Sequence, residues 1–166
     1  MRASSRLARG RPLLRALCFL FGLLFLAPAA GASSPNIVLI MADDLGWKDL
    51  GYHGSEIETP NIDGLAANGI MLERFYVQPV CSPTRSAVMT GKSPARLGLY
   101  RPISKLDPGG IPLEEKLLPE VLAEAGYHSL MVGKWHLGHA ERAYFPQARG
   151  FEHFYGHVTG NKSKNR

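Results

Sequence analysis

The feature that most restricts the fold of this chain is an apolar run at residues 36–42, which reads NIVLIMA. After Asn36 the run contains no polar side chain, and three of its residues, Ile37, Val38 and Ile40, are β-branched. A short continuous run of this kind predicts a strand that is buried on both faces. Strands in parallel sheets have that environment, so the run predicts a parallel sheet.

Helical and extended segments are predicted to alternate after this run. Proline and glycine at the segment ends support the helix boundaries, with Ser82 as the N-cap and Pro83 as the first residue of one helix. Pro119 is expected at an N-terminal boundary rather than inside a helix. The predicted helices are 61–68, 83–90 and 113–125, and the further strands are 70–77 and 127–132. This alternation predicts an α/β sheet covered on both faces, with sites beyond the carboxyl ends of its strands.

Residues 1–32 have the three parts of a secretory signal peptide. Five arginines precede a short apolar core at 16–26, and small residues at 27–32 allow cleavage after Ala32. The alternative is a membrane anchor, but the apolar core is short for a bilayer. We therefore expect residues 33–166 to enter the secretory pathway without a stable membrane anchor.

The basic charge of the chain belongs to this leader. The formal net charge is +5, and the leader contains five arginines and no acidic residue. The remaining chain is therefore close to neutral, and its charge gives no reason to expect a nucleic-acid partner.

Removal of the leader also removes Cys18 and leaves Cys81 as the single cysteine. Cysteines in an oxidising compartment usually pair. A single one indicates an intermolecular bridge, a special chemical role or a buried thiol, and the count does not decide among them. The secretory route also makes the sequon at Asn161 a candidate glycosylation site.

Three groups of polar residues are candidates for chemistry. Asp43 and Asp44 directly follow the first predicted strand, and paired carboxylates suit a hard cation such as Ca²⁺ or Mg²⁺. Neighbouring strand residues point to opposite faces, so both can reach one ion only if the chain leaves the strand there. A solvated turn or a helix cap is the alternative.

The second group is Cys81 with Arg85. Cys81 is predicted just before a helix N-terminus, which favours an anion, and Arg85 is one helical turn further on. The third group is Lys134 and His136, which share one face of an extended segment while Trp135 takes the other. The alternative for the second group is a surface arginine beside a cysteine at the start of a helix. The alternative for the third group is two surface polar residues on either side of a tryptophan that packs in the core.

Five motifs occur in one order along the chain and resemble those of the formylglycine-dependent sulfatases of the arylsulfatase type. The resemblance spans residues 35–157. The motifs are the segments 35–47 (PNIVLIMADDLGW), 59–66 (TPNIDGLA), 81–85 (CSPTR, the C-x-P-x-R signature), 133–138 (GKWHLG) and 149–152 (RGFE). The resemblance implies an alkaline-phosphatase-like α/β sandwich with a mostly parallel central sheet, of which this chain forms the N-terminal part.

The resemblance also implies a role for the single cysteine. In this family a converting enzyme reads C-x-P-x-R in the endoplasmic reticulum and oxidises the cysteine to formylglycine. Cys81 is thus implied to be the precursor of the nucleophile that attacks sulfate esters. The family pattern further implies that Asp43, Asp44 and an oxygen of residue 81 bind Ca²⁺. Arg85 would hold the formylglycine hydrate, Lys134 the sulfate, and His136 the hydrate or its proton.

Members of this family are much longer than this chain, and their further Ca²⁺ ligands lie downstream. The chain is therefore expected to be the N-terminal portion of a sulfatase catalytic domain and to be inactive alone. The alternative is a non-catalytic secreted fragment. A related phosphoesterase is disfavoured, because those relatives generally use serine or threonine. The substrate, an aryl or sugar sulfate, stays open, as does a lysosomal or extracellular destination.

Overall fold

The computed structural model describes residues 34–160 of the chain. The predicted signal peptide and the predicted glycosylation site Asn161 lie outside the described residues. The chain divides into two units, Met1–Met41 and Ala42–Arg166, and the second unit contains all the helices and strands described below. No helix in the described range has the length and apolar character needed to cross a membrane.

The second unit begins with two short 3-10 helices, η1 (Trp47–Asp49) and η2 (Gly51–His53), followed by helix α2 (Pro60–Asn68). Asp63 in the first turn of α2 connects these elements. Its Oδ1 accepts hydrogen bonds from the Tyr52 amide at 3.1 Å and the Thr59 hydroxyl at 2.8 Å. The Thr59 hydroxyl oxygen accepts a bond from the Gly51 amide in turn. The predicted helix at 61–68 is therefore confirmed.

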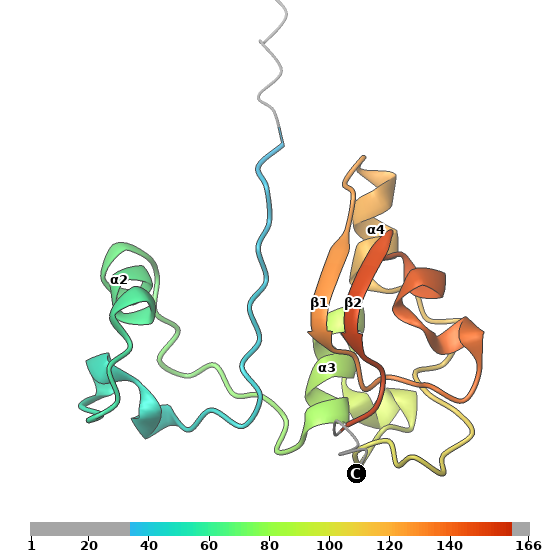
Figure 1. Cartoon of the computed structure of the whole chain (residues 1–166), viewed down its shortest axis with the longest axis horizontal. Helices are drawn as coiled ribbons and strands as arrows, with labels where there is room; N and C mark the ends of the chain where they lie inside the picture. The colour runs from blue at the N-terminus through green and yellow to red at the C-terminus, as the bar shows by residue number, and fades with distance from the viewer. Residues whose placement is uncertain (1–33, 161–166) are drawn as a thin grey trace, which may run out of the picture. The chain divides into compact units, whose positions relative to one another are not determined.

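The remaining elements form an α/β arrangement (Figure 1). Strands β1 (Leu130–Lys134) and β2 (His153–His157) pair in parallel, with Leu130 opposite His153 and Lys134 opposite His157. The elements in chain order are α3 (Cys81–Thr90), η3 (Pro94–Leu97), α4 (Leu118–Glu124), β1 (Leu130–Lys134), η4 (Arg142–Tyr144), η5 (Pro146–Arg149) and β2 (His153–His157). The parallel pairing agrees with the predicted sheet type.

Two glycines allow the strands to approach closely near the carboxyl end of this ladder. Gly133 has a φ of 114°, in the region that favours glycine. Its partner Gly156 has no room for a side chain, because a Cβ there would lie 1.8 Å from the carbonyl oxygen of Gly133. The glycines therefore fix the register just before the strand reaches Lys134.

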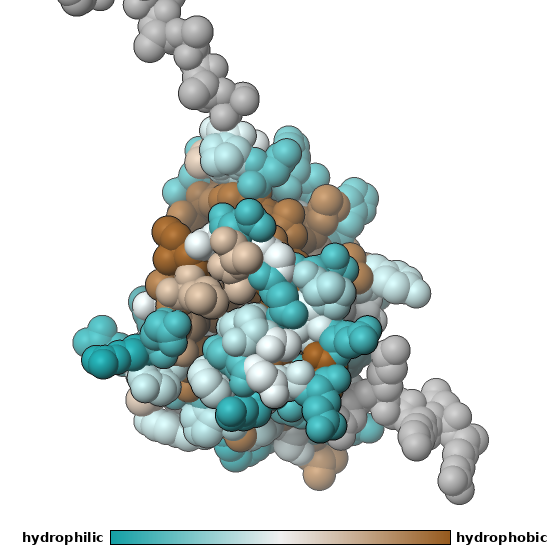
Figure 2. Space-filling view, turned by 90° about the vertical axis from the view of Figure 1, so that its left-hand side faces the viewer, coloured by the Kyte–Doolittle hydropathy of each residue, from teal (hydrophilic) through white to brown (hydrophobic). Residues whose placement is uncertain are grey.

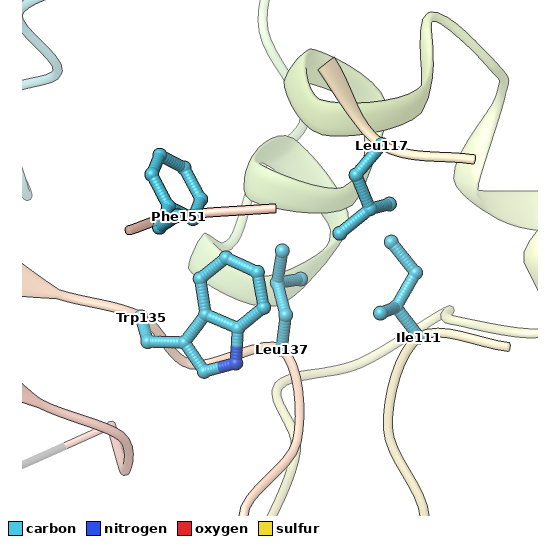
Figure 3. Packing of buried hydrophobic residues seen from close by; sticks show 5 residues of the cluster. All are labelled: Ile111, Leu117, Trp135, Leu137 and Phe151. Carbon is cyan, nitrogen blue, oxygen red and sulfur yellow. The ribbon is translucent and has the colours of Figure 1, made fainter. Parts of the chain in front are cut away.

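The core lies beside one face of this sheet. Figure 3 shows its five buried side chains, with the Trp135 ring beside Leu137 and with Ile111 near Leu117. The rings of Trp135 and Phe151 meet edge to face, 6.1 Å apart between centroids. The partly buried side chains packed against the cluster are Met89, Leu99, Met131, Phe154 and Val158. The core thus joins α3, both strands and the segments that follow them.

The other face of the sheet carries exposed hydrophobic side chains. Leu130, Val132 and Tyr155 alternate with the inward residues and are 65–81% exposed. In the view of Figure 2, hydrophobic side chains reach the surface mainly in the upper half of the picture. The prediction of a sheet covered on both faces is therefore not met within the described residues.

Two predicted strands are absent from the described residues. The segments 36–42 and 70–77 are irregular, and their hydrophobic side chains are largely exposed. A strand needs hydrogen-bonded neighbours, and the sheet of the described part contains only β1 and β2. Those two predictions were wrong for this structure. An apolar run has the composition of a strand, but a strand also needs neighbouring strands to pair with.

The observed bounds of one strand and one helix differ from the predicted bounds. The strand predicted at 127–132 is observed at Leu130–Lys134, three residues later at its start. The helix predicted at 113–125 is observed only at Leu118–Glu124, with Pro119 in its first turn as expected. Before it, the Leu117 amide donates to Glu120 Oε2 at 2.6 Å, which satisfies one amide at the helix start. Pro119 has no amide hydrogen and its ring would clash with the carbonyl four residues earlier in a longer helix, so α4 does not extend further back.

Candidate functional site

The predicted Cys81 and His136 are brought together by the structure. Cys81 is the first residue of α3, and its Sγ lies 3.2 Å from Nδ1 of His136, which follows β1 by two residues. The two residues are 55 positions apart in sequence. Cys81 is half-buried and forms no disulfide within the described part of the chain. This contact places a thiol and an imidazole at one spot beyond the carboxyl end of β1.

The backbone of His136 is strained. Its φ is 58°, which is uncommon for a residue other than glycine and costs on the order of 1–3 kcal/mol. Its amide donates to the carbonyl of Val158 at 3.1 Å. Gly160 lies against the ring, where a Cβ would approach Cε1 to 2.5 Å. Backbone strain of this kind persists where several contacts hold a side chain in a required direction.

The hydrogen bonds of the ring define the roles of its two nitrogens. Nε2 lies 2.8 Å from the carbonyl oxygen of Ile103, which only accepts, so Nε2 carries the hydrogen. Burial lowers the pKa of His136, the bond to Ile103 opposes this shift, and the charges of Lys134 and Arg85 reinforce it. The imidazole is therefore neutral at pH 7, and Nδ1 accepts a hydrogen bond from Cys81.

Arg85 and Lys134 converge on Asp43. The Lys134 ammonium lies 2.9 Å from Asp43 Oδ2, and Arg85 Nη2 lies 3.4 Å from Oδ1. Arg85 also donates through Nη1 to the carbonyl oxygen of Lys134. Burial opposes ionisation of Asp43, but the bond and charge of Lys134, together with Arg85, hold the pKa of Asp43 below its ordinary value. The carboxylate is therefore charged at neutral pH.

The two cations are largely buried while the carboxylate is not. The side chains of Arg85 and Lys134 are 10% and 12% exposed, and that of Asp43 is 43% exposed. Two positive charges thus lie near one accessible negative charge beside the thiol–imidazole pair. Such a site favours an anionic group that reaches it from solvent.

Asp44 supports the predicted departure of the chain from an extended path. Its φ is 60°, so the backbone turns between the two carboxylates. Carboxylate oxygens are the ligands that Ca²⁺ prefers, and six to eight oxygens are usual. Within residues 34–160, however, no three histidine, cysteine or acidic side chains gather at a possible metal site. Asp43 and Asp44 therefore fit part of a calcium ligand set.

Arg85 has one unused donor. Its Nε is buried and has no hydrogen-bond partner among the described residues. An orphaned buried donor costs free energy unless a partner is supplied. An added oxygen near residue 81, one turn away on α3, would fit this donor and the Nδ1 acceptor of His136. The residues present thus fit an oxygen-bearing derivative of Cys81.

Sequence reasoning missed Ser82 and Ile103. Ser82 was predicted to cap a helix, but α3 begins one residue earlier and Ser82 makes no cap. Its hydroxyl instead donates to the His136 carbonyl at 2.9 Å and accepts from the Ile103 amide at 3.0 Å. No sequence signal connects these residues, because the contacts join three segments far apart in the chain.

The loop that carries Ile103 is closed by an ion pair. Arg101 donates through both terminal nitrogens to Asp107 at 2.8 Å, and the Ser104 amide also donates to Asp107. The Arg101 bond and then the Ser104 amide lower the pKa of Asp107 to about 2. The charged carboxylate therefore holds the turn beside His136.

Acid is expected to open this loop. Because the folded pKa of Asp107 is about 2 and the unfolded value about 3.9, its stabilising effect is complete above pH ~4 and is lost as the pH falls toward 2. Protection of the Ser104 amide, measured as its exchange rate relative to that of an unfolded peptide at the same pH, should fall over that range. Asp107→Asn should show low protection at all pH values, whereas Glu56→Gln, at an exposed acid outside the loop, should behave as the parent. An unchanged profile in Asp107→Asn would contradict this assignment.

Comparison with known proteins identifies the family. The family model described as Sulfatase matches residues 35–165. The chain is 50% identical to human arylsulfatase A over 143 residues, which cover 80% of this chain and 28% of that protein. It is 44% identical to N-acetylgalactosamine-6-sulfatase of Rattus norvegicus over 167 residues, with 94% and 31% covered. The chain thus spans less than a third of these relatives.

A solved structure agrees with the sequence comparison. The crystal structure of Ps i-CgsB in complex with k-i-k-neocarrahexaose matches with a TM-score of 0.72 and 40% identity. The match covers 76% of this chain and 28% of that one. The predicted resemblance and the predicted α/β fold class are confirmed, with the described residues forming part of the domain. The chain belongs to the sulfatase family.

Proposed function

We propose that the protein hydrolyses sulfate esters, with residue 81 as the nucleophile after conversion of Cys81 to formylglycine. The observation that supports this most directly is the 3.2 Å contact between Cys81 Sγ and His136 Nδ1. It places the cysteine of the C-x-P-x-R signature against a neutral imidazole, with Arg85 one turn further along α3. A family assignment alone would not require that arrangement in this chain.

Formylglycine, once formed and hydrated, would supply one hydroxyl as the nucleophile toward the ester sulfur, with the ester alcohol as the leaving group, and a second hydroxyl that loses its proton as the aldehyde re-forms and sulfate leaves. The chain's own residues prepare this chemistry. Nδ1 of His136 accepts a proton or hydrogen bond from a hydroxyl on residue 81. The unused Nε of Arg85 donates to an oxygen there. The Lys134 ammonium offers positive charge to the sulfate oxygens, and fixed charges of this kind are a large term in catalysis.

Asp43 and Asp44 would hold Ca²⁺ together with an oxygen of modified residue 81. A divalent cation there would offset the charge of the sulfate group. Asp43 would then exchange its present contacts with Lys134 and Arg85 for the cation, which would free Lys134 for the sulfate.

The relatives support a substrate class, and the predicted signal peptide supports a setting. One relative is named for a sulfated sugar, N-acetylgalactosamine-6-sulfatase, and a solved neighbour holds k-i-k-neocarrahexaose. A sugar sulfate or an aryl sulfate is therefore the expected substrate. The formylglycine-generating enzyme is the expected partner during maturation in the endoplasmic reticulum, followed by the lysosome or the extracellular space.

The test uses two proteins made in a eukaryotic secretory host. The first is this chain, which should react with an aminooxy probe at residue 81 but show little hydrolysis by itself. The second is a chimera in which residues 35–160 replace the matching part of human arylsulfatase A. We expect the chimera to hydrolyse an aryl sulfate, and we expect Cys81→Ser to abolish both probe capture and hydrolysis.

The outcome that contradicts the proposal is a chimera that unfolds as cooperatively as the parent enzyme and captures the probe but hydrolyses no aryl sulfate. This result would favour the alternative, a secreted sulfatase fragment without catalytic function.

A further inference from the structure

Ser82 has an unusual environment for the second residue of a helix. Its side chain is fully buried, and both functions of its hydroxyl are used. The hydroxyl donates to the backbone carbonyl of His136 at 2.9 Å and accepts from the amide of Ile103 at 3.0 Å. One hydroxyl thus connects α3 to two segments that lie 21 and 54 residues away in sequence.

The first of these bonds holds the strained backbone of His136. A φ of 58° at a non-glycine residue persists only where the surroundings enforce it. The backbone of His136 is fixed on both sides, through its amide by Val158 and through its carbonyl by Ser82. Loss of the Ser82 bond would leave a buried carbonyl without its donor and allow the backbone to relax.

The second bond acts on the imidazole through Ile103. Ser82 fixes the amide of Ile103, and the carbonyl of the same residue accepts the Nε2 hydrogen of His136 at 2.8 Å. A carbonyl only accepts, so this contact selects the tautomer with hydrogen on Nε2. The other nitrogen, Nδ1, is then left as the acceptor that faces residue 81.

We infer that Ser82 is a positioning residue of the active site, which fixes both the direction and the tautomer of His136. Three hydrogen bonds close a ring through Ser82, Ile103 and His136. The inference rests on the proposed function, because an acceptor at Nδ1 matters for catalysis only if residue 81 carries the reacting hydroxyl. Ser82 itself touches no reacting atom in this arrangement.

Position 82 could require a serine either for recognition by the converting enzyme or for the hydrogen bonds of the folded site. The signature itself favours the second reason. The C-x-P-x-R signature names residues 81, 83 and 85 and leaves position 82 open. The fold, by contrast, uses the hydroxyl at 82 for two buried bonds. Substitution of Ser82 should therefore leave conversion of Cys81 intact while it changes His136.

The test compares Ser82→Ala with Ser86→Ala as a matched control. Both serines lie in α3 and are fully buried, but the Ser86 hydroxyl bonds only to the carbonyl of Pro83 within the helix. The full chain is labelled with ¹⁵N and made in a host without the converting enzyme, so residue 81 stays a thiol. The readouts are the tautomer of the His136 ring, from its nitrogen shifts at neutral pH, and the exchange rate of the Ile103 amide.

The parent and Ser86→Ala should show hydrogen on Nε2 of His136 and matching Ile103 exchange rates. Ser82→Ala should lose the single tautomer and exchange the Ile103 amide roughly tenfold faster, as expected for loss of one buried hydrogen bond. If Ser82→Ala does not fold, Ser82→Thr decides, since it keeps the hydroxyl and should keep the Nε2 tautomer.

Three results would overturn the inference. They are a parent His136 that is averaged or carries its hydrogen on Nδ1, equal effects of Ser82→Ala and Ser86→Ala, or a folded Ser82→Thr with mixed tautomers. These readouts need no substrate and no formylglycine. Their failure is therefore distinct from a failure of sulfate-ester hydrolysis.

Discussion

Replacement of Trp135 by alanine is expected to lower the free energy of unfolding by about 3–5 kcal/mol. The indole is 1% exposed, packs edge to face on Phe151, and donates through Nε1 to the carbonyl of Tyr144 at 2.8 Å. Truncation leaves a large cavity and a carbonyl without its donor. The loss is a large share of the roughly 5–15 kcal/mol that stabilises a typical domain. Urea denaturation followed by far-ultraviolet circular dichroism measures it.

The matched control is the other tryptophan of the chain. Trp47 is 60% exposed and stacks on His53 at 3.7 Å between ring centroids. Trp47→Ala should therefore cost about 0.5–1.5 kcal/mol, the range for one aromatic pair. Equal losses in the two variants would show that the core does not depend on Trp135 as described.

The second large effect is expected on catalysis. His136→Ala in the arylsulfatase A chimera should lower kcat by about 10²–10⁴-fold, the usual range for loss of a positioned acid–base group. The reason is that Nδ1 of His136 is the acceptor that faces residue 81 at 3.2 Å. Hydrolysis of an aryl sulfate, measured with substrate in excess, gives kcat directly.

His128→Ala provides the control for this substitution. His128 is a surface histidine whose side chain is 81% exposed and which pairs with Glu152. Its removal should leave kcat within about twofold, since surface substitutions have small effects. A His136→Ala chimera that keeps both its probe capture at residue 81 and its parent kcat would rule out the proposed role of His136.

The candidate site residues were assigned from short motifs, and their roles in catalysis stay predictions. The structure brings these side chains near one another: Cys81 contacts His136, Arg85 donates to the carbonyl of Lys134, and Lys134 pairs with Asp43. Each motif is a short contiguous segment, so it can be recognised in the sequence without knowledge of the fold. The helix at α2 was also predictable, because proline at its start and glycine after its end are local signals.

The predictions that were wrong concern features that depend on contacts with residues distant in sequence. The run at 36–42 has the composition of a buried strand, yet within the described residues the sheet contains only β1 and β2. Ser82 has the composition of a helix cap, yet its hydroxyl bonds to Ile103 and His136. In both cases propensity describes what a residue can do locally, and tertiary contacts decide which option is used.

The central claim is that Cys81 is the precursor of the nucleophile. Mass spectrometry of the tryptic peptide 75–85, from protein made in a eukaryotic secretory host, tests it most directly. The account predicts a peptide that has lost the elements of hydrogen sulfide and gained one oxygen at residue 81, as conversion of the thiol carbon to an aldehyde requires. An unmodified Cys81, in cells where a control sulfatase is fully converted, would contradict it.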